Sequence, residues 1–449
     1  MVRPPMAEPA HRPPPPLFRA VVLDPLQAFT RLEAAGGIAL FAAALLAFAL
    51  ANSPWGPAFL GLWETPVELS VGGRGFHADL RAVVDDGLMA LFFLVVGMEI
   101  KRELLEGELR NPRQALLPGI AALGGMAVPG LIYVAFNHGT EGAAGWAIPT
   151  ATDIAFSIGC LVLLGHRVSR GLLVFLTALA IFDDIGGILI IALFYGHGVN
   201  PEGLLWLALA TLAVFSLNRL AVENGAVYAL GGIALWLAFH HAGLHPTLSG
   251  VLLGLLVPAA TRRPVREVLE EVRAEARASF DNGKPPEASA VLRVRSVLSE
   301  ALPPLERFEA ALHPWVIFGV LPLFALANSG VSLAGLSAGS FLGPVFLGTS
   351  VGLFLGKQIG IFAFTRATVA AGLAASPGGA RWGQVYGVSV VAGIGFTVAL
   401  FIANLAFADV PHLLNEARLG VLVGSGVSGV VGTLVLRAMP LPAERTASS

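Results

Sequence analysis

The sequence predicts an all-α polytopic membrane protein of about twelve transmembrane helices, and composition and block length support that fold class. Hydrophobic residues make up 55% of the 449 residues and charged residues only 13%, whereas soluble domains are about 25% charged. The apolar residues fall in blocks that can cross a hydrocarbon layer of about 30 Å, which takes about 20 helical residues. Charged or Pro/Gly-rich breaks separate these blocks, which begin near residues 35, 86, 115, 146, 172, 203, 226, 245, 314, 342, 384 and 417.

The two ends of the chain flank one membrane domain, predicted over residues 34–437. Residues 1–33 contain Pro13–Pro16 and no apolar core of the length that a signal peptide requires, so we expect a disordered cytoplasmic tail. Residues 438–449 should form a second cytoplasmic tail. The apolar block Ala34–Ala51 then stays in the protein as its first span.

The distribution of Lys and Arg predicts the orientation of the spans. The breaks at 137–145, 195–202, 329–341 and 408–416 contain neither residue. Cytoplasmic loops are enriched in Lys and Arg, so the alternation and the even number of spans place both termini in the cytoplasm. The basic breaks are Lys101–Arg113, Arg167–Arg170, Arg219, Arg262–Arg307, Arg366–Arg381 and Arg437.

Two loops carry patterns of their own. In the first outward loop, the alternation over Val67–Val71 runs into Gly72 and Gly73, which predicts a small β-hairpin on the periplasmic side. The long inward loop, residues 261–312, places Val265, Val268, Val272 and Ala276 at helical spacing among Glu and Arg. It holds either one amphipathic surface helix or a solvated linker.

Charge and cysteine content exclude several function classes. The net charge of −2 gives no basic field that would gather nucleic acid, so no nucleic-acid partner is expected. Cys160 is the single cysteine, which excludes an intramolecular disulfide and a cysteine-based zinc site. We expect no bound cofactor.

Charged residues inside the spans carry the chemical information, because each costs about 2.5–3.5 kcal/mol to insert. Asp183 and Asp184 sit near the middle of Leu172–Phe194, which is otherwise uncharged. Neighbouring helical residues point about 100° apart, so the two carboxylates can take different roles. Burial and mutual repulsion disfavour two adjacent negative charges, so protonation should compete with cation binding. A static polar clamp between helices is the alternative.

Two segments predict interrupted helices. Pro149 removes a backbone donor shortly before Thr152 and Asp153, which leaves polar groups beside a break in mid-membrane. The run Gly393–Thr397 is a second weak point in the eleventh block. Breaks of this kind line transport sites. A plain proline kink and close glycine packing are the respective alternatives.

Lys357 is the one basic residue singled out within a span, toward the inward end of Phe341–Phe364. It can either extend to the membrane interface or form a buried ion pair with one of the intramembrane acids.

At these residues the sequence resembles the NhaA family of sodium/proton antiporters, over about residues 34–437. The motifs that carry the resemblance are DGLMA at Asp86–Ala90, VGMEIKREL at Val96–Leu104, WAIPTATDIAF at Trp146–Phe156, ALAIFDDIG at Ala178–Gly186, LHPW at Leu312–Trp315 and GIGFT at Gly393–Thr397.

The resemblance implies a function, a fold and a localisation. It implies electrogenic, pH-regulated exchange of sodium or lithium for more than one proton, in a bacterial inner membrane. It implies inverted-topology repeats with two broken helices. It also implies a homodimer joined through the hairpin at residues 67–79. Sodium, protons and the lipid bilayer are the implied partners.

The resemblance also assigns roles to residues. Asp183 and Asp184 would bind the transported ion, with Thr152 and Asp153 beside them and Lys357 paired with Asp183. The pH-linked and pathway positions would be Asp86, Glu99, Glu103, Glu309 and His245. From position alone, the three glutamates could equally be solvated and His245 a packing residue.

Three positions depart from the family pattern, and each bears on the working pH. Asp85 stands where asparagine is usual, Pro246 where alanine is usual, and Gln358 where proline is usual.

Two rival functions remain open at the sequence level. A sodium-coupled solute symporter would need a pocket for an organic solute. An intramembrane aspartyl protease could use Asp153 and Asp184, but the residues around Asp183 lack the Gly-x-Gly-Asp pattern of that class.

Overall fold

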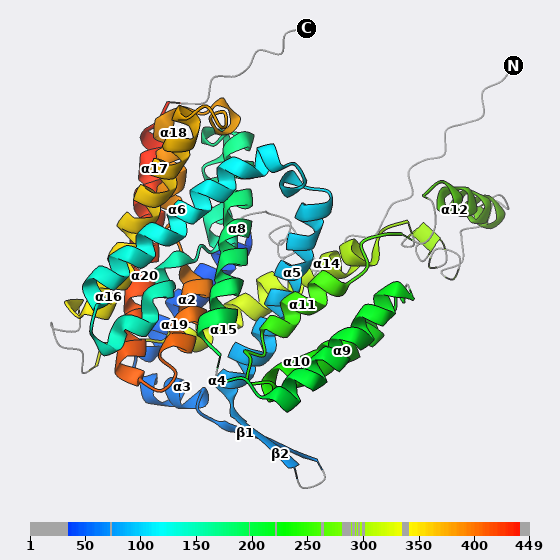
Figure 1. The fold of residues 1–449 in the computed structure, drawn as a ribbon, viewed down its shortest axis with the longest axis horizontal. Coiled ribbons are helices and arrows are strands. Elements are labelled where there is room, and N and C mark those ends of the chain that lie inside the picture. Colours follow the sequence, from blue (N-terminus) through cyan, green and yellow to red (C-terminus); the bar gives the residue numbers. More distant parts are fainter. Residues whose placement is uncertain are drawn as a thin grey trace, which may run out of the picture.

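The structure is a computed structural model that describes residues 35–71, 74–196, 198–220, 222–261, 265–280, 301–334 and 341–440, with single positions between 289 and 298. The predicted tail at 1–33, residues 441–449 of the predicted tail at 438–449 and the glycine turn at 72–73 lie outside these residues. The described chain is mostly helical (Figure 1).

Among the described residues, six helices are long and apolar enough to cross a membrane, and the number rises to eight spans if each of two bent pairs counts as one. The predicted number of twelve spans is therefore not confirmed by this count. The six are α6 (Pro112–Asn137), α8 (Arg170–Phe194), α9 (Pro201–Arg219), the continuous α14–η6–α15 (Pro304–Asn328), the continuous α16–η8–α17 (Pro344–Ala370) and α20 (Pro411–Ala438).

The other predicted blocks form shorter helices in the described chain. The four principal ones are α2 (Ala35–Ala51), α5 (Met89–Leu105), α10 (Gly225–His241) and α11 (Leu248–Leu256). Short segments connect or extend them: α3 (Gly56–Leu62), α4 (Leu80–Ala82), η3 (Glu108–Arg110), η5 (Gly165–Arg167) and η9 (Pro377–Gly379).

Several helices begin where the sequence supplies a cap. Asn111 and Asn200 accept hydrogen bonds from the backbone amides of Arg113 and Glu202, and a proline follows each asparagine at the first helical position. Proline is suited to that position because its missing N–H has no partner in the first turn. Ser169 caps α8 in the same way through the amide of Leu172.

The described part of the chain contains three π-helical turns: η2 (Val83–Leu88), η6 (Val316–Val320) and η8 (Gly352–Gly356). Such turns are rare and occur frequently at functional sites. The η2 turn contains Asp85 and Asp86, and η8 ends directly before Lys357.

Both predicted helix interruptions are confirmed. The pair η4 (Glu141–Thr150) and α7 (Ile154–Leu163) bends by 43°, and the pair α18 (Trp382–Val391) and α19 (Phe396–Ala406) bends by 44°. Close glycine packing operates at the second break as well, because a Cβ on Gly393 would lie 2.6 Å from the carbonyl oxygen of Leu353.

The predicted β-hairpin is confirmed. Strand β1 (Pro66–Val71) pairs antiparallel with β2 (Arg74–Asp79), with Pro66 opposite Asp79 and Val71 opposite Arg74. Asp79 then caps α4 through the amide of Ala82. Figure 1 shows this hairpin projecting from one end of the helical body, which we call the hairpin end.

Of the two alternatives for the long loop after residue 261, the structure shows the amphipathic helix, α12 (Val265–Phe280), which lies apart from the main body in Figure 1. The predicted end of the loop at residue 312 is wrong, because α14 already begins at Pro304. Pro303 directly precedes that helix and Pro304 opens it, which suits a helix start. Much of the remaining loop lies outside the described residues.

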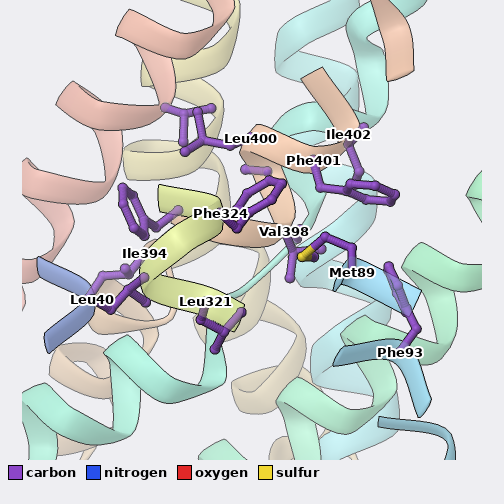
Figure 2. Close-up of a cluster of buried hydrophobic side chains, with 14 of the residues drawn as sticks. Leu40, Met89, Phe93, Leu321, Phe324, Ile394, Val398, Leu400, Phe401 and Ile402 are labelled. Atoms are coloured by element: carbon purple, nitrogen blue, oxygen red, sulfur yellow. The ribbon is translucent and has the colours of Figure 1, made fainter. Parts of the chain in front are cut away.

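Small residues set how closely the helices pack. A Cβ on Gly360 of α17 would overlap the backbone oxygen of Gly124 of α6, so these two helices meet backbone to backbone. A Cβ on Gly250 of α11 would likewise overlap the carbonyl oxygen of Ala90 of α5. A buried apolar cluster includes residues of α2, α5, α15 and α19, and part of it is shown in Figure 2.

Candidate ion-binding site

The two helix breaks lie against each other. The backbone N–H of Asp153 donates a 2.7 Å hydrogen bond to the carbonyl oxygen of Ile394, and the Thr152 hydroxyl donates to the carbonyl oxygen of Ala392 at 2.9 Å. Each interruption therefore satisfies backbone groups that the other leaves free, which is required in a hydrocarbon environment.

Asp153 joins the two interrupted helices. Its Oδ1 accepts from the amide of Phe156 at 2.9 Å and so caps α7, while its Oδ2 accepts from the amide and the hydroxyl of Thr397 at 3.1 and 2.6 Å. Because these contacts engage both carboxylate oxygens, Asp153 is poorly placed to share a catalytic water with Asp184. The aspartyl protease hypothesis needed Asp153 as the second catalytic aspartate, so this geometry counts against it.

Asp183 is 2% exposed and makes the central ion pair of the site. Its Oδ2 accepts from Lys357 Nζ at 2.5 Å and from the Thr152 hydroxyl at 2.7 Å. Its other oxygen, Oδ1, has no hydrogen-bond partner among the described residues. A buried carboxylate oxygen without a donor is an available ligand for a hard cation.

Lys357 is fully buried, so the interpretation that it extends to the membrane interface is wrong. It lies near the middle of Pro344–Ala370 and not toward its inward end, because the span continues beyond the predicted Phe364. The close approach of Gly360 to Gly124 brings α17 against α6, and the aliphatic part of the lysine passes 3.7 Å from the Cβ position of Gly125. Backbone packing thus directs the ammonium group into the core.

Asp184 faces a different environment, a cavity of about 210 Å³. The polar residues around this cavity are Thr152, Asp153 and Thr397 at the helix breaks, Asp184 of α8, Glu99 of α5 and His313 of α14. The two acids therefore lie in different surroundings: Asp183 pairs with Lys357, while Asp184 borders the cavity.

The predicted glutamates gather at the end of the molecule opposite the hairpin. Glu309 of α14 accepts from Arg102 Nη1 of α5 at 2.5 Å, and Glu103 lies 4.0 Å from the same guanidinium group. Glu99, one turn earlier on α5, lines the cavity that reaches Asp184. Glu309 is only 9% exposed and is paired with Arg102, so the alternative that it is a solvated surface residue is wrong.

Asp86 and His245 lie together at the hairpin end. His245 Nε2 is 3.7 Å from Asp86 Oδ1, and His245 Nδ1 is 2.7 Å from the Thr247 hydroxyl. The Trp236 indole donates to the backbone oxygen of Asp86 at 3.0 Å. The predicted pathway residues thus divide between two ends of the molecule, with the acid pair between them.

Sequence reasoning did not single out two important side chains. Thr397 entered only as part of a motif, although its contact with Asp153 joins the two broken helices. Arg418 is 3% exposed inside α20, yet it was not counted among the intramembrane charges. Its position within the last apolar block was the signal that could have identified it.

Comparison with known proteins identifies the family of this chain. Residues 27–436 match the family model described as Na+/H+ antiporter 1. The chain is 54% identical to Na(+)/H(+) antiporter NhaA 1 of Myxococcus xanthus strain DK1622, over 98% of both chains. It is 53% identical to Na(+)/H(+) antiporter NhaA of Anaeromyxobacter sp. strain Fw109-5, over 98% of this chain and 96% of the relative. The chain therefore belongs to the Na+/H+ antiporter 1 family, whose relatives here bear the name NhaA.

Proposed function

We propose that this protein exports sodium or lithium in exchange for protons across a bacterial inner membrane. The observation that carries the proposal is the acid pair at the crossing of two broken helices. Asp183 is held by a buried lysine, and Asp184 borders a cavity. A carboxylate can bind either a proton or a cation but not both at once. Binding of one ion therefore releases the other, and this competition produces exchange.

The oxygen atoms near the crossing of the two broken helices are the proposed ligands of the cation. Asp184 supplies a carboxylate at the cavity, and Asp183 supplies Oδ1, which has no donor among the described residues. The Thr152 hydroxyl, which contacts both Asp183 and the second break, is a further oxygen ligand. Sodium and lithium are hard ions that favour such ligands. Asp153 holds the crossing together from the side.

Charge balance explains why more than one proton would be exchanged. A cation between Asp183 and Asp184 competes with the Lys357 ammonium for the Asp183 carboxylate. If Lys357 releases its proton when the cation displaces it from Asp183, then on departure of the cation Lys357 takes one proton back as it re-forms the ion pair, and Asp184 takes a second. If more than one proton returns per sodium ion, the cycle carries net charge and responds to the membrane potential by about 2.3 kcal/mol per charge per 100 mV.

Regulation by pH is proposed for the residues at the two ends of the pathway. Glu99, Glu103 and Glu309 lie around Arg102 and the cavity, where ions would enter from the cytoplasm. A change in the protonation of this cluster would alter the Arg102–Glu309 contact between α5 and α14. At the hairpin end, Asp86 and His245 form the corresponding pair.

We further propose twelve crossings arranged as inverted repeats, with both termini in the cytoplasm. The eight longer spans are supplemented by α2, α4–α5, α10 and α11. The similar bends of the two broken pairs, 43° and 44°, support a repeat relation. The Lys and Arg distribution supports the orientation.

Everted membrane vesicles provide the test. The vesicles are energised, and collapse of the pH gradient is followed by fluorescence dequenching after sodium, lithium or potassium is added between about pH 6.5 and 9. We expect collapse with sodium and lithium that disappears in Asp183→Asn and Asp184→Asn vesicles containing equal amounts of protein. Asp409→Asn, an exposed carboxylate between α19 and α20, is the matched control.

Absence of collapse at every pH, with the protein present and folded, would reject sodium/proton exchange. Sodium-dependent uptake of an added organic solute, without collapse of the pH gradient, would favour a sodium-coupled symporter instead.

A further inference from the structure

A second charged network lies at the hairpin end, and neither the ion site nor the proposed exchange accounts for it. Its members are Asp85 of η2, Asn328 at the end of α15, Asn404 of α19 and Arg418 of α20. We call this set the hairpin-end network. It brings together four elements that are far apart in the sequence.

The two asparagines bridge the two charges of this network. Asp85 accepts from Asn328 Nδ2 at 2.7 Å and from Asn404 Nδ2 at 2.9 Å. Arg418 Nη2 donates at 2.9 Å to the side-chain oxygens of both asparagines. Each amide thus points its N–H toward the carboxylate and its oxygen toward the guanidinium. Dipoles aligned between opposite charges reinforce one another in a low-dielectric interior.

Burial makes the network dependent on both charges. Asn328 is fully buried and Arg418 is 3% exposed. A buried guanidinium without a nearby anion carries a large desolvation cost, so removal of Asp85 alone leaves Arg418 held only by amide dipoles. The hydrogen bonds of the network are therefore stable when both charges are present and are weakened when either charge is removed.

The half-helix α19 connects this network with the ion site. Thr397 near its start donates to Asp153, and Asn404 near its end donates to Asp85. Seven helical residues span about 10 Å, so one rigid element contacts a carboxylate at each end. Helix α20 is joined to α19 at two points. Ser425 of α20 accepts a hydrogen bond from the amide of Phe396 at 3.2 Å, and Arg418 of α20 contacts Asn404.

An apolar layer separates the network from the ion site. The Phe401 ring of α19 packs 5.4 Å from Phe93 and 6.4 Å from Phe324, measured between ring centroids. Met89, one turn after Asp85 on the same chain segment, is fully buried beside them (Figure 2). The 210 Å³ cavity at Asp184 reaches Glu99 and His313, on the other side of this layer.

We propose that Asp85 and Arg418 are positioning residues of the transport cycle, whose network holds α19 against α5 and α15 and closes the ion site on the hairpin side. An ion can leave on that side only if α19 moves away from Phe93 and Phe324, which requires the Asp85–Asn404 and Arg418–Asn328 contacts to break. The inference rests on the proposed function, since closure matters only where ions pass.

Accessibility of a reporter cysteine tests this closure. In a Cys160→Ser background, Met89→Cys places a single thiol in the apolar layer. A membrane-impermeant methanethiosulfonate reagent is added to intact cells and, separately, to everted vesicles, which present opposite faces of the membrane. We expect labelling from the hairpin face to be roughly tenfold faster in Asp85→Asn and in Arg418→Gln, because hydrogen bonds to a charged group are lost in each.

Matched controls separate the network from general charge loss. Asp409→Asn removes an exposed carboxylate between α19 and α20, and Arg437→Gln removes an exposed guanidinium from the far end of α20. Both should label at the parent rate. The double variant Asp85→Asn/Arg418→Gln avoids an unpaired buried charge, so it keeps the test valid if a single variant fails to fold; it should also label fast.

Two results would overturn the proposal. One is parent-rate labelling in every network variant that reaches the membrane. The other is an equal increase in the labelling rate of a reporter at Leu172→Cys when the network variants are introduced. Leu172 is fully buried at the start of α8, so such an increase would indicate that the whole protein has loosened. Exchange by the parent is measured in the same vesicles, so a failure of antiport is distinguished from a failure of closure.

Discussion

Single side chains at the helix crossing define what the site can do. Asp183 and Asp184 are adjacent, yet one is held by Lys357 and Thr152 while the other borders a cavity. Helical geometry produces this difference, because neighbouring residues project in directions about 100° apart. Substitutions at this scale should therefore separate ion binding from stability.

Asp184→Asn should abolish exchange and leave the amount of protein in the membrane unchanged. The amide keeps the shape of the side chain but cannot carry the charge that attracts the cation or accept the proton that replaces it. Vesicle dequenching measures exchange, and immunoblotting measures the protein. Exchange retained at the parent rate would remove Asp184 from the mechanism.

Lys357→Ala should lower the stability of the protein by about 3–5 kcal/mol, because it leaves the Asp183 carboxylate buried without its cation. Thermal unfolding of the purified protein in detergent measures this loss. In the double variant Asp183→Asn/Lys357→Met both charges are absent, and most of the stability should return even though exchange does not. A Lys357→Ala protein as stable as the parent would mean that the pair contributes little.

Contacts between whole helices decide where these side chains point. The backbone approach of α6 and α17 at Gly124 and Gly360 directs Lys357 inward, and the crossing of the two broken pairs places Thr152 and Asp153 beside the acid pair. The π-helical turn η8 ends immediately before Lys357 and shifts the register of the residues that follow it.

Gly360→Ala should destabilise the protein by about 1–3 kcal/mol and reduce exchange, because the added methyl group would overlap the backbone oxygen of Gly124. Gly426→Ala in α20 is the matched control, since the Cβ there meets nothing within 4 Å. Alanine is also the better helix former, so the control should be at least as stable as the parent. Equal melting temperatures for both variants would contradict the role of close α6–α17 packing.

At the scale of the whole molecule, the hairpin end and the opposite end have different chemistry. The opposite end carries the Arg102–Glu309 pair and access to the cavity, while the hairpin end carries an apolar layer and the hairpin-end network. The β-hairpin projects from the hairpin end (Figure 1). Its two strands pair with each other, so each has one edge that the other strand does not cover.

We predict that a second copy of the chain pairs with this hairpin and forms a homodimer. A two-stranded hairpin is only marginally stable alone, and an open edge can add a strand from another chain. Deletion of residues 67–79 should convert the purified protein from dimer to monomer, measured by light scattering on size exclusion. A dimer that persists after the deletion would assign the interface to the helices.

The sequence by itself determined the fold class, the two helix breaks, the hairpin and the positions of the intramembrane acids. These features depend on local physics: the hydropathy of a block, a proline or glycine within it, and the high cost of a charge in hydrocarbon. The resemblance to antiporters, and not any spacing, pointed to the pairing of Lys357 with Asp183.

Only the tertiary structure decided which groups meet. Asp183 and Lys357 are 174 residues apart, Asp153 and Thr397 are 244 apart, and Asp85 and Asn404 are 319 apart. No local pattern encodes such contacts, because they arise where separately folded helices cross. The way the helices cross therefore determined the partner of each buried carboxylate. It also determined which carboxylates lie at the ion site and which belong to the hairpin-end network.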